Sequence, residues 1–207
     1  MKKRLTKTID TSNKIVDTYI SKTKGLEPLK ELRKFKSLLP KNAIVLDAGC
    51  GWGRDSKILS NDFKVIGIDL SNNLLSYAKE YAPKVIFKKS DVTNAGLKTN
   101  TFDGLWSNVV LLYLEREDVL PVLKDFYRIL KRGGVAYILV KEGEGFEYKS
   151  EDMSGEKPRF YTLFTKKEFE KYLKQAGFST IEIYIFSEKR RLGLKRDLGV
   201  INCFVRK

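Results

Sequence analysis

The chain contains no histidine among its 207 residues. This absence excludes imidazole bases, histidine metal ligands and the Ser-His-Asp triads of many hydrolases. Any general base in this protein must therefore be a carboxylate, a lysine or a tyrosine.

Cysteine is nearly as scarce, since Cys50 and Cys203 are the only two and neither belongs to a C-x-x-C pair. This spacing indicates neither a disulfide framework nor a zinc site, so we expect reduced thiols and no metal. Long hydrophobic runs are missing as well, and none approaches the length of about 18 residues that a membrane-spanning helix needs. The basic residues 1–4 are not followed by the apolar segment of a signal peptide. We therefore expect a cytoplasmic protein with no membrane partner.

Acidic residues are outnumbered, with 26 Asp and Glu against 40 Lys and Arg, which gives a net charge of +14. Such a charge attracts polyanions and raises their encounter rate. An RNA partner is therefore one hypothesis, and the basic stretch 189–196 is its most local support. A compositional bias is the alternative, because lysine is abundant along the whole chain.

Helical and strand patterns alternate along the chain, which favours a single α/β domain over residues 1–207. Two helical patterns come first, at about 11–22 and 26–39, and form a helical cap over residues 1–40. Short apolar runs then predict a parallel sheet with helices on both faces. The expected strands are 43–47, 64–69, 84–88, 102–108, 135–141, 179–186 and 199–205, and the expected helices end near 60 or cover 72–81, 116–130 and 165–175.

Two further patterns concern the ends of elements. Gly133 and Gly134 are expected to end the helix at 116–130. Ser71 is expected to cap the helix at 72–81.

The segment 142–164 breaks the alternation of helical and strand patterns, and a connection of that length is either disordered or a functional lid. We expect a lid loop there.

The strongest local signal is a glycine-rich turn, Asp47-Ala48-Gly49-Cys50-Gly51-Trp52-Gly53, directly after the first strand. Glycines let the backbone turn tightly and approach a ligand closely. The G-x-G-x-G spacing, with an acid two residues ahead, differs from the G-x-G-x-x-G fingerprint of dinucleotide sites. A carboxylate there repels a pyrophosphate and attracts a cation, by about 1 kcal/mol at ~4 Å in water. The pattern therefore favours S-adenosylmethionine over NAD.

Polar residues also end the next strands. Asp69 ends the second strand and can accept both hydroxyls of a ribose, while Asp91 follows the third and can accept an adenine amino group. Asn108 ends the fourth strand, near the expected position of the reactive methyl group. Ligands bind outside the carboxyl ends of such strands, where all these signals fall. Taken singly, Asp69 could instead cap a helix and Asp91 could belong to a turn.

These motifs resemble the class I S-adenosylmethionine-dependent methyltransferases over roughly residues 44–205. The resemblance rests on residues 46–53, 67–71, 90–92, 102–108 and 128–134. It implies a Rossmann-like, seven-stranded, mostly parallel sheet whose last strand is antiparallel. It also implies that Gly49 and Gly51 pass the methionine part of the cofactor, and that Asp91 and Val92 frame the adenine. The full implied cofactor set is Tyr19, Asp47, Gly49, Cys50, Gly51, Asp69, Leu70, Asp91, Val92 and Asn108.

A narrower resemblance joins residues 53–56 and 106–114 to small-molecule methyltransferases of the tellurite- and thiopurine-modifying kind. Many of those relatives carry a small polar residue at the position of Val110 and a histidine at that of Tyr113, and this chain has neither. The resemblance therefore transfers no acceptor and no histidine base. Asn108 is also not followed by the Pro-Pro-aromatic motif of enzymes that methylate exocyclic base amines.

The acceptor side yields candidates rather than an assigned catalytic residue. Asn108, Tyr113 and Lys141 are the catalytic candidates. Acceptor contacts are expected from Tyr113, Lys141, Glu144, Arg159 and Tyr161. Three hypotheses follow: a methyltransferase with a small-molecule acceptor, which we favour, a tRNA or rRNA methyltransferase, or a protein that binds S-adenosylmethionine without catalysis.

Overall fold

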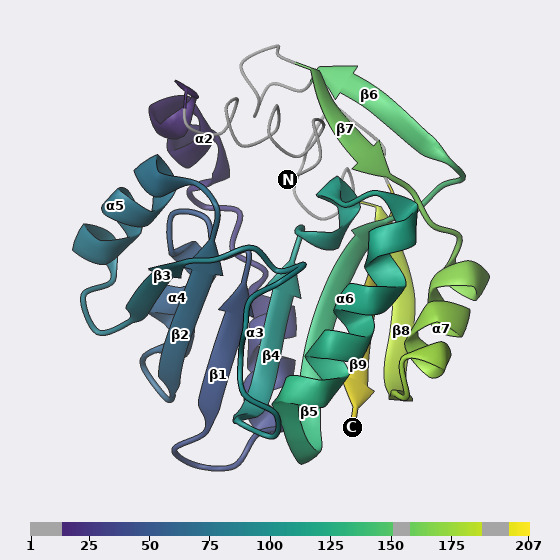
Figure 1. The fold of residues 1–207 in the computed structure, drawn as a ribbon. Coiled ribbons are helices and arrows are strands. Elements are labelled where there is room, and N and C mark those ends of the chain that lie inside the picture. The colour runs from purple at the N-terminus through teal and green to yellow at the C-terminus, as the bar shows by residue number, and fades with distance from the viewer. Residues whose placement is uncertain (1–13, 151–157, 188–198) are drawn as a thin grey trace.

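The computed structural model describes residues 14–150, 158–187 and 199–207, and Figure 1 shows its central sheet. Seven strands lie in the order β3-β2-β1-β4-β5-β9-β8. Strand β9 pairs antiparallel with both β5 and β8, whereas the pairs from β3 to β5 are parallel. The predicted sheet is thereby confirmed. Its strands are β1 Ile44–Ala48, β2 Lys64–Asp69, β3 Ile86–Lys89, β4 Phe102–Asn108, β5 Leu130–Lys141, β8 Ser179–Ser187 and β9 Gly199–Arg206.

Helices cover both faces of this sheet, because its central strands are apolar on both sides. Along β5, Ala136 and Ile138 belong to one hydrophobic cluster, whereas Val135 and Tyr137 belong to the other. Side chains of α6 and α7 pack into the first cluster, and those of α3, α4 and α5 pack into the second. The helices are α2 Val16–Thr23, α3 Leu29–Ser37, α4 Arg54–Leu59, α5 Asn72–Tyr81, α6 Arg116–Ile129 and α7 Lys166–Gln175, with a 3-10 turn η1 at Leu111–Tyr113.

The expected helix cap at Ser71 is confirmed, since its Oγ accepts a hydrogen bond from the Leu74 N–H at 3.2 Å. The role expected of Gly133 and Gly134 was wrong. Helix α6 ends at Ile129, and β5 begins at Leu130, five residues earlier than predicted. The two glycines lie inside β5, where the Gly133 N–H donates to the Lys207 carbonyl and the Lys207 N–H donates to the Gly134 carbonyl, each at 2.9 Å.

The segment 142–164, expected as a lid loop, carries two strands in its described part. Strands β6 Phe146–Ser150 and β7 Pro158–Thr162 pair antiparallel into a hairpin. Figure 1 shows this hairpin at the same end of the molecule as α2, above the carboxyl end of β5. Arg116 holds the two ends of the hairpin together, because its Nη2 donates to the carbonyls of Leu163 at 2.6 Å and Gly145 at 3.1 Å.

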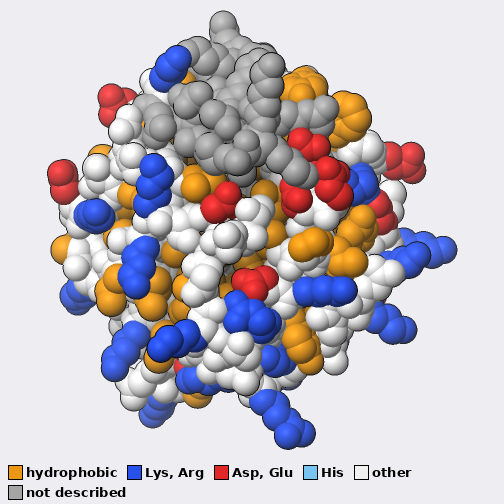
Figure 2. Space-filling model, in the orientation of Figure 1, with side chains coloured by type: hydrophobic (Ala, Val, Ile, Leu, Met, Phe, Trp, Pro, Cys, Tyr) orange, Lys and Arg blue, Asp and Glu red, His pale blue; other side chains and the backbone are white. Residues whose placement is uncertain are grey.

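The basic character of the chain does not concentrate in one place on the face that Figure 2 shows. There the described Lys and Arg side chains are spread among hydrophobic and acidic ones. The basic stretch 189–196 lies outside the described residues. Within the described ranges, no helix combines the length and the apolar character that crossing a membrane requires.

Candidate functional site

The glycine turn joins β1 to α4 with a left-handed backbone at three glycines. Gly49, Gly51 and Gly53 have φ values of 78°, 54° and 82°. The N–H groups of Gly49 and Cys50 both donate to the Ile68 carbonyl, at 2.8 and 3.0 Å, which ties the turn to the end of β2. Cys50 itself is buried, and burial raises the pKa of its thiol well above the usual range, as expected for a packing residue.

Two of these glycines face different surroundings. A Cβ at Gly49 would lie 2.6 Å from the Val110 Cβ, so that position must stay bare for the loop after β4 to pack against it. Within the described ranges, a Cβ at Gly51 would meet nothing within 4 Å. The space beside Gly51 is therefore open to a ligand, while Gly49 serves the close approach of two loops.

Asp69, at the end of β2, faces the same turn. Its Oδ2 accepts the Gly51 N–H and its Oδ1 accepts the Ser71 N–H, each at 2.9 Å. Burial raises the pKa of this carboxyl, and the backbone N–H groups only partly oppose that shift. The Leu70 backbone also contributes a hydrogen bond. A carboxylate offers about four acceptor positions, so capacity remains for a further hydroxyl donor.

Helix α2 is held over the turn by a short chain of hydrogen bonds. The Trp52 indole donates to the Thr23 hydroxyl at 2.9 Å, and this hydroxyl donates to the Tyr19 carbonyl at 2.7 Å. Tyr19 thereby joins the site. Burial, followed by the neighbouring Tyr113, raises the pKa of Tyr19 to about 12. The phenol keeps its proton at neutral pH and can act as a hydrogen-bond donor.

Asp47 lies beneath the turn and is almost fully buried. The Ser56 hydroxyl donates to its Oδ2 at 2.5 Å. Burial, with the charge of Asp55 as the next cause, raises the pKa of Asp47 to about 8. At neutral pH the carboxyl is therefore mostly protonated, and the attraction for a cation that the sequence suggested requires loss of that proton. An approaching cation favours this loss, because it stabilises the charged form.

The raised pKa of Asp47 makes a prediction for stability. The unfolded group titrates at 3.8 and the folded group at about 8, so between these values the unfolded chain has lost a proton that the folded chain keeps. Stability therefore falls as pH rises through this window. Asp47→Asn should remove that part of the slope and unfold at a higher temperature than the wild type near pH 8, with little difference below pH 3.8, where both states keep the proton. Thermal unfolding at both pH values checks it. The same curve for both proteins would contradict it, and Asp62→Asn, at an exposed acid, is the control.

The buried carboxylate of Asp55, in the first turn of α4, accepts hydrogen bonds from three side chains, and these form the Asp55 hydrogen-bond network. Its Oδ1 accepts Arg54 Nε at 2.7 Å, and its Oδ2 accepts Trp106 Nε1 at 2.9 Å and Asn108 Nδ2 at 2.7 Å. Burial pushes the pKa of Asp55 upward, but the Arg54 guanidinium and the other two donors outweigh it and hold the pKa below its usual range. The Asp55 hydrogen-bond network fixes the end of β4 relative to the glycine turn.

Beyond Asn108 the chain turns in an unusual conformation. Val109 has a φ of 67°, which β-branched residues rarely adopt. The next residue, Val110, then lies against Gly49. Strain of this kind concentrates at functional sites and persists only where the surroundings impose it. Here the Asp55 hydrogen-bond network before Val109 and the contact of Val110 with Gly49 after it impose this strain.

The residues expected around an adenine follow β2 and β3. The Ser90 N–H donates to the Asp69 carbonyl at 3.0 Å, which places the two strand ends together. Asp91 Oδ1 accepts the N–H and the hydroxyl of Thr93, at 2.9 and 2.8 Å, so this carboxylate also stabilises a turn. Val92 is buried in the core, and Leu70 is half-buried beside Asp69.

Most of the residues expected on the acceptor side come together beneath the hairpin. Arg159 Nη1 donates to the Tyr113 hydroxyl at 3.2 Å, and the rings of Tyr113 and Tyr161 lie 5.5 Å apart. Lys141 Nζ lies 3.3 Å from the centre of the Tyr161 ring. Arg159 also lies 5.4 Å from the ring of Tyr19, which links this cluster to the cofactor side. Glu144 is exposed on the connection to β6.

Sequence reasoning assigned no role to Arg54, Asp55 and Trp106 or to the backbone of Val109. The adjacent opposite charges at the start of α4 are the signal that could have drawn attention to Asp55. Its partners Trp106 and Asn108 are 51 and 53 residues away in the chain, and no local sequence pattern predicts these contacts. Within the described ranges, no group of acidic and cysteine side chains could hold a metal ion.

Comparison with known proteins adds to this geometry. A family model described as a methyltransferase domain matches residues 45–134. The chain is similar to phosphoethanolamine N-methyltransferase 3 of Arabidopsis thaliana, at 31% identity over 186 residues that cover 86% of this chain and 37% of the plant protein. An uncharacterized protein of Methanocaldococcus jannaschii is 30% identical over 156 residues, which cover 73% of this chain and 72% of that protein. The chain thus spans little more than a third of the plant relative and most of the archaeal one.

A solved structure provides a match to the fold. It is the 1,6-didemethyltoxoflavin-N1-methyltransferase of Burkholderia thailandensis, crystallised with 1,6-didemethyltoxoflavin and S-adenosylhomocysteine. The TM-score is 0.71 at 20% identity, with coverage of 100% of this chain and 91% of that one. At this identity the similarity concerns the fold alone.

Proposed function

Because the chain belongs to the class I S-adenosylmethionine-dependent methyltransferases, we propose that it transfers the methyl group of S-adenosylmethionine to a small-molecule acceptor. The observation that carries this proposal is the open space beside Gly51, bordered by the carboxylate of Asp69. When bound, S-adenosylmethionine supplies a methyl group that its positive sulfur makes reactive.

The residues around this space suit the parts of that cofactor. Asp69 retains an acceptor position for a ribose hydroxyl, and Gly51 leaves room for the methionine chain. Tyr19 keeps its proton and can donate a hydrogen bond to the methionine carboxylate. Asp91 and Val92, next to Asp69 through the Ser90 hydrogen bond, would frame the adenine.

The chain's contribution to methyl transfer is then mainly positioning. Holding two reactants in line can supply about 7–11 kcal/mol of a reaction barrier. Asn108 is fixed by Asp55 at the end of β4 and marks the place where the methyl group and the acceptor would meet. The β6–β7 hairpin, which carries Arg159 and Tyr161, would act as the lid that excludes water from this place. A proton from the acceptor would pass to Tyr113 or Lys141 only when that group is in its deprotonated form.

A small-molecule acceptor agrees with the relatives. The plant relative is named for phosphoethanolamine and the structural match for 1,6-didemethyltoxoflavin, and both are small molecules. The scattered basic side chains of Figure 2 favour an RNA acceptor less, because nucleic-acid sites gather cations on one face.

The test is calorimetric titration of the protein with S-adenosylmethionine, with NAD as the control ligand. We expect micromolar binding of the first alone. Gly51→Ala should weaken this binding by about tenfold or more, since a side chain there enters the space assigned to the methionine chain. Gly96→Ala is the matched control, because Gly96 also has a positive φ, of 61°, and open surroundings, and lies outside the proposed site.

Both glycine variants should lose a similar, small amount of stability from the left-handed conformation. Equal cofactor affinity of the two variants would refute the placement beside Gly51. A preference for NAD, or no binding of S-adenosylmethionine, would refute the proposed function. Tight cofactor binding without methylation of any compound in a panel of small molecules would favour a non-catalytic binding protein.

A further inference from the structure

Arg159 is the buried cation of the acceptor cluster. It comes from β7 and is only 5% exposed. Among the described residues its hydrogen-bond partner is the Tyr113 hydroxyl, and its buried Nε has no partner at all. Its guanidinium otherwise lies near the rings of Tyr19 and Tyr113. No carboxylate in the described part of the chain forms an ion pair with it.

This arrangement is costly unless something else completes it. A charge taken out of water must be compensated by an opposite charge and by hydrogen bonds. Burial alone would lower the pKa of Arg159, yet the neighbouring tyrosines leave it raised, so the group stays charged. The phenols supply one hydrogen bond and no formal negative charge. The guanidinium therefore has no anionic partner among the described residues.

Among the described residues, the surroundings of Arg159 also carry more positive than negative charge. Lys141, only 4% exposed, lies against the Tyr161 ring. Residues that pair directly across two antiparallel strands share a face, so Glu147 opposes Tyr161 and Lys149 opposes Arg159 on the inner face of the hairpin. Among the described side chains of this cluster, Glu147 is thus the single acid beside three cations. A buried Oε1 of Glu147 also has no partner there.

The aromatic rings of the cluster do not form a cage for a cationic acceptor. Lys141 occupies the face of Tyr161, and Arg159 lies within 6 Å of Tyr113 and Tyr19. Rings that bind a quaternary ammonium ligand leave their faces free for it. The cations of the protein itself already lie against these rings, and the unpartnered Nε of Arg159 can meet a ligand of opposite sign.

We propose that the acceptor carries a carboxylate or phosphate group and that Arg159 binds this group between Tyr113 and Lys141. This proposal rests on the proposed function and names its substrate class. A guanidinium presents Nε and a neighbouring Nη as two parallel donors, which match two oxygens of a carboxylate or phosphate. The bare Nε supplies one of these donors. The anionic end of the acceptor is thereby held beneath the hairpin, and its other end can extend toward Asn108 for methylation.

The experiment is calorimetry on the full-length protein saturated with S-adenosylhomocysteine. Inorganic phosphate and citrate serve as probes of the two anion types, at an ionic strength kept constant with sodium chloride. We expect at least one probe to bind, and Arg159→Gln to weaken that binding by about tenfold or more. The probe that binds more tightly identifies a phosphate or a carboxylate acceptor.

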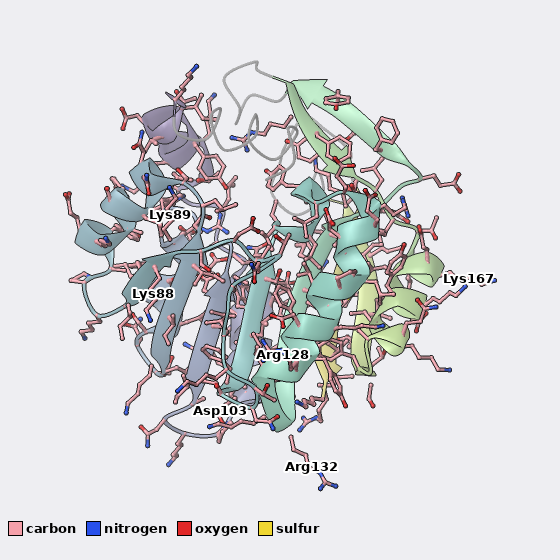
Figure 3. All side chains as sticks on the ribbon, viewed as in Figure 1. Lys88, Lys89, Asp103, Arg128, Arg132 and Lys167 are labelled. Atoms are coloured by element: carbon pink, nitrogen blue, oxygen red, sulfur yellow. The ribbon has the colours of Figure 1, made fainter. Side chains whose placement is uncertain are left out.

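Arg132→Gln is the matched control. Arg132 is exposed at the far end of β5, and Figure 3 shows it projecting from the end of the sheet opposite the hairpin. This variant should bind the anion as the wild type does, which separates a site effect from a general loss of positive charge. Arg159→Lys keeps the charge and loses the two-donor geometry, so it should retain only part of the affinity. The apo form of Arg159→Gln should melt no lower than the wild type, because a buried charge has been removed.

Three outcomes overturn the proposal. Failure of both anions to bind the wild-type complex rules out an anion site. Equal weakening by Arg159→Gln and Arg132→Gln assigns the effect to net charge. Loss of S-adenosylhomocysteine affinity in Arg159→Gln, with anion binding unaltered, assigns Arg159 to the cofactor carboxylate instead. Failure of the wild type to bind S-adenosylhomocysteine at all refutes the proposed function, so the two failures are distinguishable.

Discussion

Asp55→Ala is expected to destabilise the protein by about 3–5 kcal/mol, because it removes one partner of a buried ion pair. Arg54 would lose the carboxylate that lies 2.7 Å from its Nε. The buried Trp106 indole and the Asn108 amide would lose their acceptor at the same time. Urea unfolding, followed by circular dichroism, measures the loss of unfolding free energy.

A second ion pair in the same protein supplies the control. Asp125 accepts Arg128 Nε, also at 2.7 Å, but there the side chains are 32% and 40% exposed. Exposed pairs contribute about 0–1 kcal/mol, so Asp125→Ala should change the unfolding free energy little. Similar small losses for both variants would mean that Asp55 is not desolvated in solution. Asp55→Asn keeps the shape and one acceptor, and should fall between Asp55→Ala and the wild type.

Asp69→Ala is expected to weaken the binding of S-adenosylmethionine by more than about tenfold, which corresponds to about 1.4 kcal/mol. The variant removes the proposed acceptor of a ribose hydroxyl. It also frees the Gly51 N–H, which Asp69 holds at 2.9 Å, so the turn is less well ordered for the methionine chain. Calorimetric titration of the variant and the wild type measures the change.

Asp62→Ala is the control for charge, since Asp62 is exposed and pairs with Lys36 at the surface. It should bind S-adenosylmethionine as the wild type does. Melting temperatures recorded without ligand separate a loss of fold from a loss of site. An unchanged affinity in a folded Asp69→Ala protein would refute the ribose assignment.

The fold could be predicted from the sequence because its signals are local. Apolar runs followed by a glycine turn or an acid identified the strands, and helix signals such as the Ser71 cap identified the intervening elements. The error at Gly133 and Gly134 has a local cause as well. Glycines near the end of a helical pattern usually end the helix, and Gly133 does have a left-handed φ of 77°. The residue that pairs with both glycines inside β5 is Lys207, which lies more than seventy residues further along the chain.

The cofactor side of the candidate site could also be predicted from the sequence, for a related reason. In a parallel sheet the carboxyl ends of the strands meet at one edge, so residues that end successive strands become neighbours without any knowledge of packing. The structure brings Gly51, Asp69 and Ser90 together in this way. The charge state of Asp47 could not be predicted from the sequence, because it depends on burial and on the nearby charge of Asp55.

The sequence by itself determined the seven strands of the central sheet and the helices between them, the glycine turn and the row of polar residues at the strand ends, but not the two strands of the β6–β7 hairpin. Only the tertiary structure decided which distant groups meet: Asp55 with Trp106 and Asn108, and Arg159 with Tyr113 and Tyr19. It also imposed the left-handed backbone of Val109, which no local preference would choose. The physical reason is that periodicity and turn chemistry act over a few residues. Desolvation, ion pairing and backbone strain depend instead on what the whole chain packs around each group.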